Sequence, residues 1–455
     1  MGCQKLLVVN VVGLTPGVLS SMPTLSKLTN SWQLLHLKPA LPAVTCTSQA
    51  TITTGTLPRQ HGIVSNGWYF RDSAETRFWL RSDRLVQGEK IWDVAKSNGM
   101  KTANLFWRFC THSSCDIVVT ERPTYWANGK KSPDVFCWPG NLRERLVEQF
   151  GPFPLFRFWG PATNIESTQW IADATEKVIE EQQTDLTLTY LPHLDYDLQK
   201  YGPSSSQATQ AIEELDRVVT HLVSRAKEAG LRVVLLSEYG MADVDKPVYL
   251  NRILRENGFL EVQNAQNGEL LECGQSRAFA ACSHQVAHVY VHHPQDISAV
   301  KKLISSVDGV AEVLDADGIK QQGLDHPRSG ELVVVAQPGC WFAYPYWLDE
   351  SRAPDFAHCV AIHDKPGHDP AEMFLGPGGK ARVAKRVLQN RMRMRVPFDV
   401  ISTDATKIRG SHGRLAEGSQ DGPILLSDTA IDGIQDDALS MHEVKSKLLD
   451  LLVRA

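Results

Sequence analysis

Short apolar runs alternate, along the first half of the chain, with longer segments whose apolar residues recur at helical spacing. The runs at residues 5–12 and 233–236 predict buried strands, and further strands are predicted at residues 102–106 and 186–191. Helices are predicted at residues 20–28, 49–54, 91–98, 165–181 and 207–229. This alternation predicts an α/β fold in which a parallel sheet is sandwiched by helices.

The pattern changes between residues 277 and 342. Shorter strands are predicted at residues 287–291, 310–314 and 331–336, around one helix at residues 297–307. We expect an inserted, smaller α+β cap at residues 277–342, and a core domain made of residues 1–276 and 343–455. The stretch 355–375, rich in His and Pro, is predicted to lead back to the main sheet, and residues 441–452 are predicted to form the last helix.

Composition narrows the classes of function. The 455 residues carry a formal net charge of -5. This mildly acidic balance, together with the expectation that the chain has no basic block or stripe, predicts neither a nucleic-acid polymer nor a membrane as partner. The apolar run Leu6 to Leu14 is too short to cross a bilayer. Nine cysteines without a CxxC pair predict reduced thiols and a cytoplasmic location.

Polar residues with chemical potential follow several predicted strands. Thr45 precedes a predicted helix, whose free N–H groups could hold the oxygens of a phosphorus centre that the hydroxyl attacks; helix capping is the alternative role. Asp195 follows the strand at residues 186–191, and Glu238 and Tyr239 follow the strand at residues 233–236. His412 lies between two glycines, where the backbone can approach a ligand closely. We expect these side chains to meet at the carboxyl ends of the parallel strands.

The region around Thr45 carries a family resemblance. Thr54-Gly55 is followed by the run Pro58-x-x-His61-Gly62-Ile63-x-x-Asn66. Further motifs follow in the same order along the chain: Gly13-Leu14, Asp195 with Tyr201-Gly202-Pro203, Ser237-x-x-Gly240-Met241 and Gly410-x-His412-Gly413. Together they resemble the type I phosphodiesterase/nucleotide pyrophosphatase branch of the alkaline phosphatase superfamily. Residues 363–370 are similar to a segment of its phosphonoacetate hydrolase-like members.

The resemblance implies an alkaline phosphatase-like sheet with a variable cap, Thr45 as nucleophile, and two zinc ions held by Asp and His. Several positions depart from that pattern. Val12 stands where the family has Asp, Gln199 and Tyr239 where it has His, and Glu238 where it has Asp. Ser48 replaces an Asn that assists the phosphate. Asp195 and His412 keep the family's residues.

These departures leave open whether the site binds a metal ion. One zinc or other divalent ion shared by Asp195, Glu238 and His412 is one possibility, with His363, His358 or Asp197 as replacement ligands; no metal is the other. In a metal-free site, Glu238 or Asp195 would act as general base and Tyr239 as proton donor. Ser48 and Lys365 are the candidate substrate-binding residues, because a lysine can hold an acidic group without metal.

The sequence leaves two alternative functions open. The first is a hydrolase acting on a phosphoester, phosphoanhydride or related acidic small molecule through Thr45 and an altered metal site. The second is a non-catalytic or differently catalytic member that kept the fold to bind a ligand. Aromatic residues in the loops at 68–81 and 106–138 favour a ring-bearing ligand, although they could equally pack these loops onto the domain.

Overall fold

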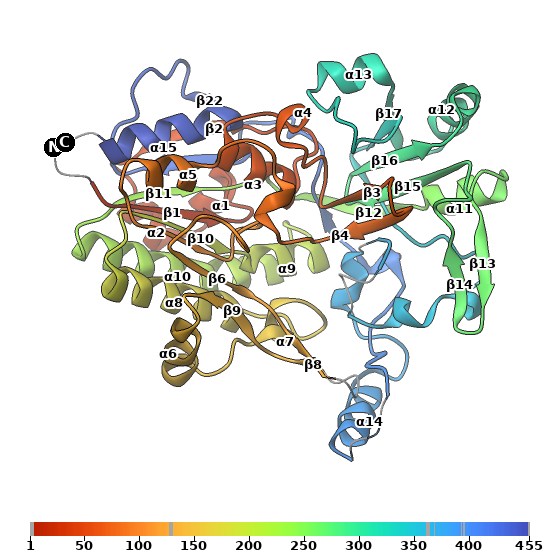
Figure 1. Ribbon diagram of the computed structural model, residues 1–455, viewed down its shortest axis with the longest axis horizontal. Helices are drawn as coiled ribbons and strands as arrows, with labels where there is room; N and C mark the ends of the chain where they lie inside the picture. Colours follow the sequence, from red (N-terminus) through yellow and green to blue (C-terminus); the bar gives the residue numbers. More distant parts are fainter. Residues whose placement is uncertain are drawn as a thin grey trace.

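A nine-stranded sheet forms the centre of the larger lobe (Figure 1). The computed structural model describes residues 4–126, 131–360, 365–367, 369–392, 394 and 396–453. The strand order is β22-β2-β21-β11-β1-β10-β5-β6-β9. The strands span β1 Leu6–Val11, β2 Gln33–Lys38, β5 Thr102–Leu105, β6 Ile117–Glu121, β9 Val135–Trp138, β10 Leu186–Leu191, β11 Arg232–Leu236, β21 Ile424–Ser427 and β22 Ala438–Ser440.

The middle of this sheet is parallel. Strands β11, β1, β10, β5 and β6 run in one direction, with β1 paired to β10 on one side and to β11 on the other. Every residue of β1 and β10 is buried, including Asn10 of β1 and the two threonines of β10, and the remaining residues are apolar or aromatic, as expected for strands covered on both faces. Strands β21 and β9 are antiparallel to their neighbours β11 and β6. The predicted sandwich around a mostly parallel sheet is confirmed.

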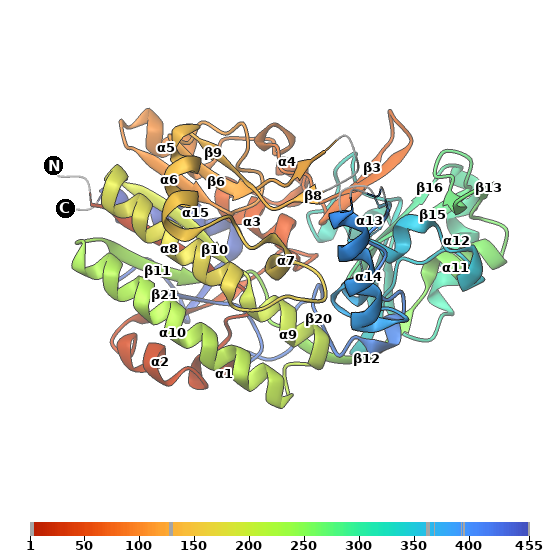
Figure 2. The same cartoon turned by 90° about the horizontal axis from the view of Figure 1, so that it is seen from below.

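Helices cover both faces of the sheet (Figures 1 and 2). One layer contains α3 Thr45–Thr54, α5 Ile91–Ser97 and α15 Val444–Val453, which contact one another. The other contains α6 Asn141–Phe150, α8 Glu166–Gln182, α9 His193–Tyr201 and α10 Ser206–Glu228. The longest, α10, buries Ile212, Leu215, Val219 and Leu222, the apolar row expected from their spacing.

The second lobe is built on a four-stranded antiparallel sheet in the order β15-β16-β18-β17. Its strands are β15 Ala278–Ser283, β16 Val286–Val291, β17 Val310–Leu314 and β18 Leu332–Ala336. Around it lie α11 Leu250–Glu256, α12 Ile297–Ser305, α13 Ala316–Gln321, α14 Gly379–Arg391 and the hairpins β3 Gly67–Phe70 with β4 Glu75–Phe78 and β13 Val262–Ala265 with β14 Gly268–Leu271. The boundaries of a cap at 277 and 342 stay a prediction.

A three-stranded sheet is formed by β19 Gly339–Phe342, β12 Ala242–Val248 and β20 Gly410–Ser411; Figure 2 labels β12 and β20 where the two lobes meet. The shorter elements include α4 Pro58–His61, α7 Leu155–Phe158, β7 Thr124–Tyr125, β8 Lys131–Ser132 and the 3-10 turns Asp355–His358 and Pro370–Met373. In the described residues, no helix is both long and apolar enough to cross a membrane.

Several local predictions were wrong. The helix expected at residues 20–28 is two helices, α1 Pro16–Ser20 and α2 Pro23–Leu28, because Pro23 starts a new helix rather than continuing one. Thr45 is the first residue of α3 rather than part of a loop before it. Asp195 lies in the first turn of α9. The described part of the stretch 355–375 joins no strand of the main sheet, and the chain rejoins that sheet at β21.

Candidate active site

The sheet positions Thr45, Asp195, Glu238 and His412 at one end of its parallel strands. Glu238 and Tyr239 come two and three residues after the end of β11, and Asp195 comes four residues after the end of β10. Thr45 begins α3, and His412 follows β20. Thr45 and His412 are 367 residues apart in the sequence, yet both side chains contact Tyr239.

A tyrosine hydroxyl is the centre of this group. The Tyr239 hydroxyl lies 3.1 Å from the Thr45 hydroxyl and donates a hydrogen bond of 3.1 Å to Asp195 Oδ1. The Tyr239 ring also stacks on the His412 ring, with 3.6 Å between centroids and 4° between planes. Nucleophile candidate, phenol and carboxylate are therefore joined in one hydrogen-bonded row.

His412 is held from both sides. Its Nδ1 donates to the Ala43 carbonyl at 3.0 Å, and its Nε2 lies 3.9 Å from Asp195 Oδ1. The His284 ring, from the turn of the β15–β16 hairpin, lies 4.0 Å from the His412 ring. The backbone N–H of Gln285 donates to the His412 carbonyl at 2.9 Å. The second lobe thus lies directly over this imidazole.

Glu238 belongs to a buried polar network that the sequence analysis missed. Its Oε1 accepts hydrogen bonds from the side-chain amides of Asn10, at 2.5 Å, and Gln49. Gln49 in turn accepts from the Arg108 backbone N–H at 2.6 Å, and Arg108 pairs with the buried Glu121 at 2.7 Å. The polar Asn10 inside an otherwise apolar strand was the sequence feature that could have indicated this network.

Burial is the largest cause of the pKa shifts of the site's ionisable side chains. It raises the pKa of Asp195 to about 6, against hydrogen bonds from Gln199 and Tyr239 that lower it. It raises the pKa of Glu238 to about 8 and that of Tyr239 well above its usual value of 10. Burial also lowers the pKa of His412 to about 3. At neutral pH the imidazole is therefore neutral, and Glu238 is mostly a neutral acid.

The donors at this place do not fit a pair of zinc ions. Val12 and Gln199 supply no carboxylate or imidazole, and the Tyr239 phenol lies between Thr45 and Asp195. Glu238 Oε1 is already bound by two amides. Among the described residues, no three His, Cys, Asp or Glu side chains are grouped so that they could hold a metal ion. His363 lies outside the described residues.

The two predicted substrate-binding residues are engaged with other groups. Ser48 is fully buried in α3, and its hydroxyl donates to the Glu238 carbonyl at 3.4 Å. The Lys365 side chain is 0% exposed and pairs with Glu372 at 2.7 Å. The turn Pro370–Met373 that carries Glu372 packs on α9. The described contacts of Lys365 therefore join it to a separate ion pair rather than to Thr45.

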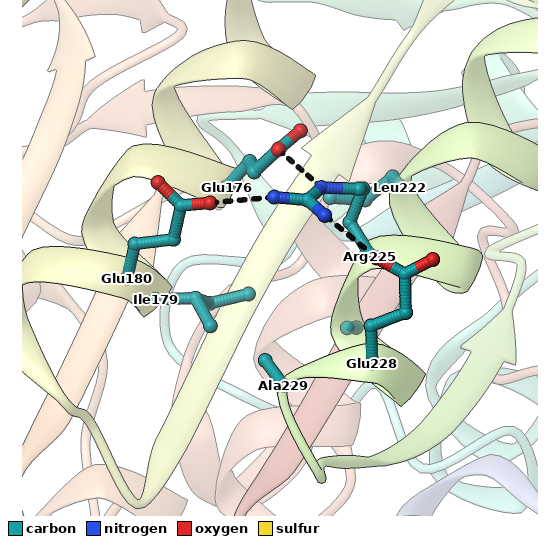
Figure 3. Close-up of a pocket in the computed structure, with 8 residues that line it drawn as sticks. Glu176, Ile179, Glu180, Leu222, Arg225, Glu228 and Ala229 are labelled. Carbon is teal, nitrogen blue, oxygen red and sulfur yellow. Dashed lines mark hydrogen bonds and ion pairs between the residues drawn. The ribbon is translucent and has the colours of Figure 1, made fainter.

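The site is closed. Thr45, Tyr239 and His412 are 2%, 1% and 2% exposed, while the Asp195 side chain retains 13%. A hollow between α8 and α10 lies elsewhere, on the outer face of the helical layer (Figure 3). There Arg225 binds Glu176, Glu180 and Glu228 at 2.7, 2.8 and 2.6 Å, so this hollow contains a satisfied ion network.

Known proteins resemble the chain at two levels. In sequence, it is 25% identical over 248 residues to human ectonucleotide pyrophosphatase/phosphodiesterase family member 1, a match covering 51% of this chain and 23% of the relative. It is also 25% identical over 238 residues to venom phosphodiesterase 2 of Crotalus adamanteus, covering 50% and 25%. The matches thus span about a quarter of these relatives' length.

In structure, the chain resembles phosphonoacetate hydrolase of Sinorhizobium meliloti, solved with phosphonoformate, with a TM-score of 0.63 and 14% identity over 98% of this chain and 96% of that one. Murine ectonucleotide pyrophosphatase/phosphodiesterase 5, solved as an inactive form with AMP, gives a TM-score of 0.60 at 13% identity, covering 99% and 96%.

The family model for type I phosphodiesterase/nucleotide pyrophosphatase matches residues 6–367, most of the chain. The matched region includes Thr45, Asp195 and Glu238, whereas His412 lies beyond it. These findings confirm the resemblance inferred from the motifs: the chain belongs to the type I phosphodiesterase/nucleotide pyrophosphatase family.

Proposed function

We propose that the chain hydrolyses a small phosphoester, phosphoanhydride or related acidic molecule, with Thr45 as nucleophile. The supporting observation is the row formed by the Thr45 hydroxyl, the Tyr239 hydroxyl and the Asp195 carboxylate, each 3.1 Å from the next. A hydroxyl aligned with a base of pKa about 6 is the arrangement that nucleophilic catalysis near neutral pH requires.

In this mechanism Thr45 Oγ1 attacks the phosphorus and its proton passes to the Tyr239 oxygen, while the Tyr239 proton passes to Asp195. The leaving group departs with its electron pair and takes a proton, for which the neutral Glu238 is the nearby acid. Water then cleaves the phospho-threonine ester and restores the hydroxyl. The positive end of the α3 dipole, at Thr45, would face the transferred group's oxygens, although the Cys46 N–H of this turn donates to Asn66 Oδ1 at 2.9 Å.

Access to this row requires movement, because Thr45 and Tyr239 are almost fully buried. The β15–β16 hairpin is the element to move, since its turn contacts His412 through His284 and Gln285. Displacing it would leave α3, β11 and α9 in place. A ring-bearing substrate and a cytoplasmic location are parts of the same proposal.

A matched pair of threonine variants tests the proposal. Thr45→Ala should abolish hydrolysis of an aryl phosphodiester, of AMP and of phosphonoacetate, for whichever of these the wild type cleaves. Thr47→Ala makes the same chemical change two residues further along α3, where the buried hydroxyl has no recorded partner, and should retain activity. Equal activity of wild type and Thr45→Ala would remove Thr45 from the mechanism.

A ligand-binding protein without hydrolytic activity is the second candidate. The observation favouring it is that the cation described near the row is already engaged: Arg108 is paired with Glu121, and Tyr239 supplies a neutral phenol. Calorimetry with AMP and with phosphonoacetate distinguishes the two candidates. If wild type and Thr45→Ala both bind these ligands and neither forms a hydrolysis product, the chain is a ligand-binding protein.

A further inference from the structure

Helix α14, Gly379–Arg391, is exposed to an unusual degree. It projects from the second lobe away from the rest of the molecule (Figure 1). None of its residues is buried, and Leu388 and Met392, at its C-terminal end, are 58% and 57% exposed. Large apolar side chains are normally the first to be covered when a surface helix packs on its protein.

The helix carries its polar side inward. Arg386 binds Asp399 through two hydrogen bonds of 2.6 and 2.8 Å, and Arg382 binds the same carboxylate at 2.5 Å. Gln389 accepts a further bond from Arg386. These residues, one helical turn apart, form the half-buried side of α14.

The outward side carries an apolar stripe. Ala381, Ala384, Leu388 and Met392 are all exposed, and their spacing of three, four and four residues places them in one row along the helix. An amphipathic helix of a globular protein has the opposite orientation, with such a row against the core. Water is therefore a poor final environment for this side of α14.

Cations border the stripe on both sides. Lys380 and Arg391 flank it on one edge and Lys385 on the other, and all three are exposed. Residues 380–395 contain seven Lys or Arg and no Asp or Glu, although the whole chain has a net charge of -5. The expectation that the chain has no basic block is therefore wrong for this segment, and the mild overall acidity does not describe it.

We propose that α14 docks on the surface of an anionic lipid bilayer. Leu388 and Met392 would enter the headgroup boundary, while Lys380, Lys385 and Arg391 extend to lipid phosphates, which is how interfacial helices bind. A second copy of the same face is excluded as occupant by its like charge. Nucleic acid would satisfy the cations but leaves the apolar row in water, so the lipid surface fits better.

Vesicle co-sedimentation of the full chain tests the proposal. Binding is expected to phosphatidylcholine vesicles containing phosphatidylglycerol, and not to phosphatidylcholine alone. Replacing Lys380, Lys385 and Arg391 by Gln should weaken it about 100-fold, because each cation near an anionic surface contributes about fivefold. The matched control replaces Lys27, Arg217 and Lys302, exposed cations of α2, α10 and α12, by Gln and should bind as wild type does.

The apolar stripe needs its own variant. Leu388→Gln with Met392→Gln should abolish binding at moderate salt, whereas Leu348→Gln with Leu415→Gln, which alters exposed leucines outside α14, should not. Because α14 buries no side chain, circular dichroism should show all variants folded. Absence of vesicle binding, equal loss in the control variants, or tight binding to duplex DNA that the stripe variant retains would each overturn the proposal.

Discussion

The Tyr239 ring lies parallel to the His412 ring at 3.6 Å and places its hydroxyl between Thr45 and Asp195. One side chain thereby joins the three elements α3, α9 and β20 at the end of the sheet. A phenol in this position donates and accepts hydrogen bonds but is a poor metal ligand at neutral pH. The following predictions test what this placement means.

Removing only the phenol oxygen should separate chemistry from packing. Tyr239→Phe keeps the stack on His412 but breaks the link between Thr45 and Asp195. We expect kcat to fall about 100-fold or more, with a loss of about 1–2 kcal/mol in unfolding free energy. Steady-state kinetics measure kcat, and urea unfolding measures the free energy of unfolding.

Tyr346→Phe is the matched control for that variant. Tyr346 is also buried, and its hydroxyl donates to the Glu269 carbonyl at 3.0 Å in the second lobe. Its loss should cost similar stability without changing kcat. If both variants reduce kcat equally, the phenol of Tyr239 has no role beyond packing.

Zinc binding should be weak in the wild type and should increase on one substitution. Tyr239→His would put an imidazole beside Asp195 and His412, completing three ligands of the kind zinc prefers. We expect well under one equivalent of zinc in wild type and in Tyr239→Phe, but tighter binding in Tyr239→His. Elemental analysis and zinc titration check this; one tightly held zinc in the wild type would contradict it.

Acid should destabilise the protein through His288. Its Nε2 donates to the Val64 carbonyl at 3.0 Å while its Nδ1 accepts from the Gly330 N–H at 3.2 Å, so the ring is held neutral. Burial lowers its pKa from 6.5 to about 4. The unfolded state therefore binds the proton more tightly, and stability present above pH 6.5 is lost as the pH falls towards 4, by at most roughly 3 kcal/mol.

Urea unfolding at several pH values measures this effect. His288→Gln should be less stable than wild type at pH 7 but should lose less stability between pH 6.5 and 4. His221→Gln, the same change at a side chain that is 59% exposed, is the control variant. Parallel curves for wild type and His288→Gln would show that His288 does not contribute.

A methyl group at Gly410 should disturb the site from outside it. A Cβ there would overlap the Leu198 carbonyl of α9, so either α9 or the strand that precedes His412 must shift. We expect Gly410→Ala to cost about 1–3 kcal/mol and to lower activity as well. Gly140→Ala is the control, because φ there is -59° and no atom lies within 4 Å of the added carbon. Thermal unfolding and kinetics of the two variants provide the comparison.

The sequence by itself determined the class of the fold and the family. Buried parallel strands such as β1 and β11 consist mostly of apolar residues, so the local pattern predicts their positions. The motifs around Thr45, Asp195 and His412 indicated that these residues belong to one site. Even the mismatch at Tyr239 was visible as a residue that binds metal poorly.

Only the tertiary structure decided how these groups meet. That the phenol lies between Thr45 and Asp195, and that Lys365 is neutralised by Glu372, depends on contacts between segments far apart in the chain. The burial that raises the pKa of Asp195 and Glu238 comes from two lobes packed together. Likewise, a basic apolar helix can be found in a sequence, but which of its sides faces solvent is set by the partner of Arg382 and Arg386 on the protein, Asp399.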